Sequence, residues 1–87
     1  MPGCEAQTFT GVTPHQFTCI AQKAQEESGL ALSGDSGTVS AQGISVSWTF
    51  DPLSLTLTIQ CTDKPMFVPC GMLSSKIRDI VDSCLGY

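Results

Sequence analysis

Apolar and polar residues alternate strictly along two runs in the middle of the chain. In residues 44–50, Ile, Val, Trp and Phe alternate with Ser and Thr, and in residues 53–61, Leu, Ile and Cys alternate with Ser, Thr and Gln. Because successive side chains of a strand point to opposite faces, this period of two predicts two β-strands. Asp51 and Pro52 separate the runs and predict a tight reversal, hence an antiparallel hairpin. A weaker strand over residues 38–42 would complete a three-stranded meander.

Two segments outside the meander have helical periodicity. The first helix is predicted over Pro14–Ser28, because Thr13 and Gln16 match a capping box and a proline suits the first helical position. Gly29 would supply the left-handed residue that ends this helix. The second helix begins near Cys70, and its apolar residues recur every three or four positions. They form one stripe: Leu73, Ile77, Ile80, Val81 and Cys84.

Together these elements predict a single α+β domain with the order α-β-β-β-α. Two amphipathic helices and a meander with one apolar face would form a two-layer sandwich, with both helices on that face. Residues 7–10 could add a short strand before the first helix. The 87 residues suffice for one domain with a modest core. We predict that this core contains Phe17, Ile20, Trp48, Leu57, Ile59, Ile77 and Ile80.

Composition and charge narrow the class of protein. The chain is 41% hydrophobic and 14% charged, as expected of a globular domain. Its net charge is −4, and its four basic residues are too few and too scattered to form the basic patch that binds nucleic acid. No segment is apolar enough to span a membrane, and the first residues resemble no secretory signal. We therefore predict a cytoplasmic location.

Five cysteines are many for a chain of this length. Their odd number and the missing signal argue against a disulfide framework, and no two of them form a CxxC pair. We predict free cysteines that pack as small apolar side chains. Cys61 would end the apolar face of its strand, Cys84 would lie in the helical stripe, and Cys4 would lie in a mobile tail.

Two short motifs, taken together with the order of elements, suggest a resemblance to a known family. "SGL", residues 28–30, closes the first helix, and "KPMF", residues 64–67, leads into the last one. Over about residues 17–81, the order helix, meander, helix resembles that of the small bacterial proteins associated with polyhydroxyalkanoate granules. The resemblance implies this order of elements for the fold. It implies no catalytic residue and no ligand.

His15 is the only histidine, and it lies four residues before Cys19 on the same helix. That spacing places both side chains on one face, so a Cys–His dyad or half of a zinc site is geometrically possible. The alternative is that His15 is a polar residue of the first turn and Cys19 borders the core. A closed zinc site needs about four ligands, and the remaining candidates are scattered singly. We predict neither a metal nor another cofactor.

Cys70 stands where the last helix begins. A cysteine at a helix N-terminus can be an activated nucleophile, so one candidate is a small thiol protein that uses Cys70 for redox chemistry or ligand attachment. No second catalytic residue lies near it in the sequence. We interpret Cys70 as the residue at which a loop becomes a helix, and residues 66–69 as an apolar crossover that closes the end of the sandwich.

The polar positions of the two alternating runs define a candidate binding surface. If the apolar positions face the helices, the reverse face of the sheet carries only uncharged polar residues: Ser45, Ser47, Thr49, Ser54, Thr56, Thr58 and Gln60. Exposed sheets usually carry charges that discourage association. One interpretation is a solvated face stabilised by Ser–Thr pairs across strands. The other is a contact surface, most simply with the same face of a second copy.

No carboxylate pair in a catalytic setting, phosphate-binding loop or hydrolase motif is recognisable in the sequence. We therefore predict a non-catalytic binding module rather than an enzyme. Its partner would be another protein or a second copy of the chain, and its binding residues would include Ser45, Ser47, Thr49, Thr56 and Thr58.

Overall fold

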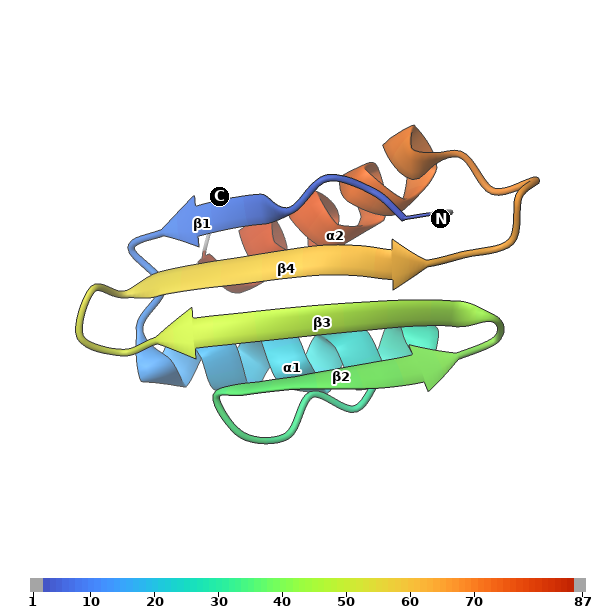
Figure 1. The fold of residues 1–87 in the computed structure, drawn as a ribbon. Coiled ribbons are helices and arrows are strands. Elements are labelled where there is room, and N and C mark those ends of the chain that lie inside the picture. Colours follow the sequence, from blue (N-terminus) through green and yellow to red (C-terminus); the bar gives the residue numbers. More distant parts are fainter. Residues whose placement is uncertain (1–2, 86–87) are drawn as a thin grey trace.

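The computed structural model describes residues 3–85 and contains one antiparallel sheet and two helices. The elements in chain order are β1 (Gln7–Thr10), α1 (Pro14–Ser28), β2 (Ser36–Ala41), β3 (Ile44–Asp51), β4 (Thr56–Asp63) and α2 (Cys70–Leu85). Both helices lie against the same face of the sheet, and the other face is left open (Figure 1). Within residues 3–85, no helix is both long enough and apolar enough to cross a bilayer.

The predicted α+β class is confirmed, but the order of the sheet is not a simple meander. Its strands lie in the order β1-β4-β3-β2, so the consecutive strands β2, β3 and β4 are neighbours and β1 joins the edge beside β4. The short additional strand therefore exists and makes the sheet four-stranded. The chain crosses from β1 to the far edge through α1, which lies behind β2 and β3 (Figure 1).

The boundaries of α1 follow from its local sequence, as predicted. The Thr13 hydroxyl accepts a hydrogen bond from the Gln16 N–H at 3.2 Å, and the Gln16 side chain accepts one from the Thr13 N–H at 3.0 Å. At the other end Gly29 has a φ of 73°, and its N–H donates to the Gln25 carbonyl at 3.0 Å. The capping box and the left-handed glycine thus satisfy backbone groups that the helix ends leave unpaired.

The turn between β3 and β4 is longer than predicted, and β4 begins at Thr56 rather than at Leu53. Of the two favoured two-residue hairpin turns, type I′ needs a positive φ at Pro52, which its ring forbids, and type II′ needs one at Asp51, a position usually taken by glycine. Asp51 instead accepts a hydrogen bond from the Leu53 N–H at 3.0 Å, and Leu55 takes the positive φ of 56°. Leu53 is consequently 96% exposed, and the prediction that it belongs to the apolar face of the strand is wrong.

The core fills the space between the sheet and the helices. All seven predicted residues belong to one cluster, in which Ile77 is partly buried and the other six are buried. Phe17 stacks on Phe50 with ring centroids 4.7 Å apart, and the Trp48 indole N–H donates to the Gly34 carbonyl at 3.2 Å. Further buried members of this cluster are Val12, Val46, Phe50 and Val81.

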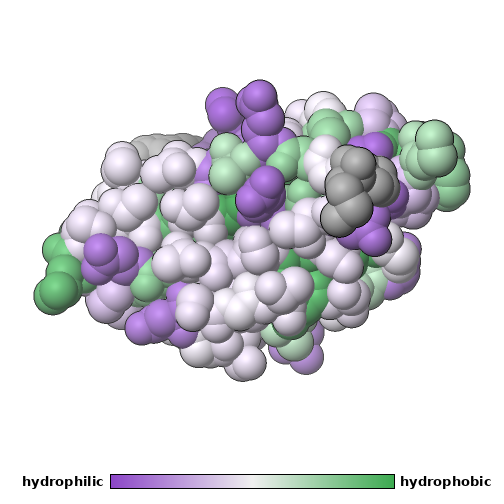
Figure 2. Space-filling view, viewed as in Figure 1, coloured by the Kyte–Doolittle hydropathy of each residue, from purple (hydrophilic) through white to green (hydrophobic). Residues whose placement is uncertain are grey.

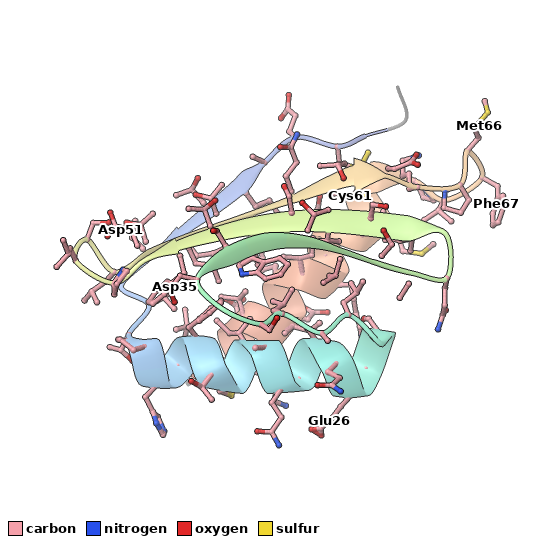
Figure 3. The ribbon with its side chains drawn as sticks, turned by 60° about the horizontal axis from the view of Figure 1, so that its bottom comes forward. Glu26, Asp35, Asp51, Cys61, Met66 and Phe67 are labelled. Carbon is pink, nitrogen blue, oxygen red and sulfur yellow. A yellow bond between two sulfur atoms is a disulfide. The ribbon has the colours of Figure 1, made fainter. Side chains whose placement is uncertain are left out.

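The loop from β4 to α2 does not close the end of the sandwich. Met66 and Phe67 are 90% and 87% exposed, and they project from the end of the sheet opposite to Asp51 (Figure 3). The Val68 N–H donates to the Pro65 carbonyl at 3.1 Å, which makes a turn with Met66 and Phe67 at its tip. The predicted apolar crossover is therefore wrong.

Four of the five cysteines form disulfides, which corrects the prediction of free cysteines. Cys4 is bonded to Cys70 and Cys19 to Cys84, with Cα atoms 5.7 and 5.8 Å apart. The partners are 66 and 65 residues apart in sequence, so only the tertiary fold brings them together. Closing a loop of this size stabilises a fold by about 4 kcal/mol in the chain-entropy treatment. Among the described residues only Cys61 is free, and it is buried.

Candidate functional site

The open face of the sheet carries rows of polar side chains that run across the strands. Because their neighbours in sequence belong to the core, these residues point away from the helices. The longest row crosses all four strands through Thr8, Thr58, Thr49 and Ser36. We call this surface the hydroxyl face. It consists of Thr8, Thr10, Ser36, Thr38, Ser40, Ser45, Ser47, Thr49, Thr56, Thr58 and Gln60.

The structure brings the five predicted binding residues together on the hydroxyl face. Thr49 lies directly opposite Thr58, and Ser47 lies opposite Gln60 on the same pair of strands. Sequence reasoning missed the contributions of the two outer strands, β1 and β2. For β1 the sequence "QTFT" contains the alternation that indicates two faces, since Phe9 packs against the core while Thr8 and Thr10 are exposed.

Most of the hydroxyl groups on this face are free to bind something else. Ser40 and Ser45 share a hydrogen bond at 2.7 Å across β2 and β3. Within residues 3–85, by contrast, the hydroxyls of Ser47, Thr49 and Thr58 make no hydrogen bond to another protein group. Each can donate one hydrogen bond and accept two. The face therefore offers a dense array of donors and acceptors.

The hydroxyl face is almost free of charge. The only charged residues in the four strands are Asp51 and Asp63, each at the last position of its strand. Figure 2 shows this side of the molecule, and most of the surface over the sheet is pale, neither strongly hydrophilic nor strongly hydrophobic. Nothing on the central rows would repel another uncharged polar surface.

The structure does not assemble the candidate dyad or half zinc site on α1. The sulfur of Cys19 is bonded to Cys84 and is therefore not a thiolate ligand. His15 is exposed in the first turn of α1. Within the described part of the chain, no three His, Cys, Asp or Glu side chains lie close enough together to hold a metal ion.

Cys70 is the first residue of α2, so the loop becomes a helix there as predicted. Its sulfur is bonded to Cys4, and a thiol function would first require reduction of that bond. Cys4 does not lie in a mobile tail, because its N–H also donates to the Cys61 carbonyl at 2.8 Å. The disulfide thus holds the segment before β1 against the start of α2, and the hydrogen bond holds it against β4.

Comparison with protein-family models, with curated proteins and with solved structures found no match to this chain. The resemblance to polyhydroxyalkanoate granule proteins therefore stays a prediction. The role of the hydroxyl face has to be argued from its own geometry and chemistry.

Proposed function

We propose that this protein is a non-catalytic binding module that self-associates through its hydroxyl face in a two-fold dimer. One observation carries the proposal: an uncharged row of hydroxyl side chains crosses all four strands on the face that no helix covers. Hydroxyl groups are both donors and acceptors, so such a surface is complementary to itself. A two-fold axis would place equivalent rows against each other.

The size of the hydroxyl face predicts a weak dimer. The strands have four, six, eight and eight residues, and at a rise of about 3.3 Å per residue and about 4.8 Å between strands they cover about 400 Å². Two copies would then bury on the order of 800 Å², which is in the range of weak and transient interfaces. A polar interface of this size retains bridging water molecules. We therefore expect a reversible dimer that forms at high micromolar concentration.

Two lysines in the middle of the face test the dimer. The double variant Ser47→Lys, Thr58→Lys places four positive charges in the two-fold interface, and burying unpaired charges there strongly disfavours association. We expect this variant to be monomeric in sedimentation equilibrium at concentrations at which the wild type associates, with an unchanged circular dichroism spectrum.

The matched control carries the same charges on the helices. Gln22 and Ser75 are exposed on α1 and α2, away from the open face, so Gln22→Lys, Ser75→Lys should associate like the wild type. A wild type that remains monomeric at high micromolar concentration would rule out the dimer. Equal loss of association in both variants would show that net charge, rather than the hydroxyl face, controls it.

The disulfides support a location different from the predicted cytoplasm. Structural disulfides persist in oxidising compartments and are rare where glutathione and thioredoxin keep thiols reduced. The chain forms two of them, and each ties a segment near the start of the chain to α2. We infer that the binding module works in an oxidising compartment.

A further inference from the structure

A second site lies on the other side of the sheet, between the sheet and the helices. A cavity of about 180 Å³ is lined mainly by carbon atoms from both helices, from the segment after α1 and from three strands. Ile20 and Ala24 contribute from α1, Leu73 and Ile77 from α2, and Ile44 and Ile59 from the sheet. It lies toward the end of the molecule at which α1 ends and α2 begins.

The two helices are clamped differently at their two ends. They run antiparallel, and the Cys19–Cys84 disulfide joins them at one end. At the other end Lys76 Nζ lies 2.6 Å from Glu27 Oε1. From Cys19 to Glu27 the helix advances about 12 Å at 1.5 Å per residue. Both Glu27 and Lys76 line the cavity, so the cavity lies at the end at which no disulfide joins the two helices to each other.

The ion pair between Lys76 and Glu27 holds the two helices together only weakly. The Lys76 and Glu27 side chains are 47% and 40% exposed, and ion pairs at such positions contribute little because water and salt screen them. The start of α2 is held by the Cys4–Cys70 disulfide, but the end of α1 has no covalent restraint and can move away from α2 locally, while the disulfide between the two helices keeps their other ends together. This asymmetry gives a small molecule a route into the cavity without global unfolding.

The lining selects for an uncharged ligand. The two charged lining residues, Glu27 and Lys76, neutralise each other. Among the described residues the one buried side-chain polar atom without a hydrogen-bond partner is Oε1 of Gln7, which is not part of this lining. The other polar residues of the lining are Ser28 and Gln42, so a polar ligand would replace few of the hydrogen bonds that it makes to water.

We propose that this cavity binds a small, uncharged, apolar molecule, such as a single aromatic ring or a short branched hydrocarbon. Its volume sets the size, since an apolar cavity of about 150 Å³ in another protein stays dry and binds benzene. The site is separate from the hydroxyl face and does not depend on the dimer.

Thermal unfolding with benzene as the probe tests the site. At about ten times its dissociation constant, a ligand that binds only the folded state should raise the Tm of a domain of this size by roughly 5 °C or more. We expect benzene to raise the Tm of the oxidised protein and benzoate, its charged analogue, to leave it unchanged. The absence of a benzene effect, or an equal effect of benzoate, would overturn the proposal.

Substitutions that fill the cavity provide a second test of the proposal. Ala24 lines the cavity, whereas Ala31 is exposed and lies outside the lining. Ala24→Phe should abolish the response to benzene, and Ala31→Phe should retain it. If Ala24→Phe does not fold, Ala41→Leu fills the same cavity from β2. A full response in a folded cavity-filling variant would show that benzene binds elsewhere.

Cys61 provides a direct reporter of occupancy. Its side chain lines the cavity, and it is the free cysteine of the described chain. Benzene should slow the modification of Cys61 by methyl methanethiosulfonate, a small uncharged thiol reagent, several-fold, and benzoate should not. Modification at the same rate with and without benzene would contradict occupancy of this cavity.

Discussion

At the scale of single residues, Leu57 is the most informative test of the strand register. It is completely buried in the core, and its neighbours Thr56 and Thr58 lie on the hydroxyl face. Leu57→Ala should lower the free energy of unfolding by about 2–5 kcal/mol, because it removes buried methyl groups and leaves a cavity. Guanidinium denaturation measures this loss.

The matched control for Leu57 is Leu53, which is 96% exposed in the β3–β4 turn. Leu53→Ala should change the free energy of unfolding by less than about 0.5 kcal/mol, as is usual for surface positions. A loss below about 1 kcal/mol for Leu57→Ala would mean that the strand is shifted by one residue, since such a shift exchanges its two faces.

Residues whose structural role depends on near neighbours could be predicted from the sequence, and those that depend on distant ones could not. Thr13, Gln16 and Gly29 satisfy the ends of α1 through contacts within four residues, so their pattern is visible in the chain. The disulfide partners Cys19 and Cys84 are 65 residues apart and meet only because two helices pack side by side. Cysteine count and spacing hold no information on that packing.

At the scale of elements, β3 and β4 could be predicted from the sequence because their apolar and polar residues alternate strictly. The sequence predicts too short a turn between β3 and β4, because the alternation of apolar residues continues through Leu53 and Leu55 although the chain there is not extended. The pairing of β1 with β4 depends on how the chain crosses behind the sheet. The hydroxyl face was therefore predicted for the two central strands and not for the outer two.

The ion pair between the helices makes a prediction about pH. The hydrogen bond from Lys76, followed by the positive charge of Lys76 and a smaller effect of Lys23, lowers the pKa of Glu27 below its ordinary value of 4.5. A carboxyl whose pKa is lower in the folded state stabilises the fold at pH values above its unfolded pKa. That contribution is lost as the pH falls through the lowered value.

We therefore expect Glu27→Gln to be slightly less stable than the wild type at pH 7, and the difference to disappear at pH values below the lowered pKa of Glu27, where the carboxyl is protonated in both states. The difference should also shrink in about 1 M salt, because both side chains are exposed. Glu26→Gln is the control, since Glu26 lies on the same helix and points away from the sheet (Figure 3). A difference that does not shrink as the pH is lowered from 7 would indicate a structural effect of the substitution rather than the loss of the ion pair.

At the scale of the whole molecule, the two disulfides compensate for a small core. A domain of this size buries a limited share of its surface and is marginally stable without covalent or other support. Cys4–Cys70 attaches the segment before β1 to the start of α2, and Cys19–Cys84 attaches α1 to the end of α2. The last helix is thus bonded near both of its ends to the first part of the chain.

The oxidised state predicts a specific thiol count and a large effect of reduction. Unfolded in guanidinium without reductant, the protein should react with one equivalent of a thiol reagent, from Cys61, whereas after reduction all five cysteines should react. Each disulfide closes a loop of more than sixty residues, so removing one should lower the free energy of unfolding by about 4 kcal/mol in the chain-entropy treatment. The double variants Cys4→Ala, Cys70→Ala and Cys19→Ala, Cys84→Ala measure the two bonds separately. Five reactive thiols in protein purified without reductant from an oxidising compartment would contradict both the pairing and the location inferred from it.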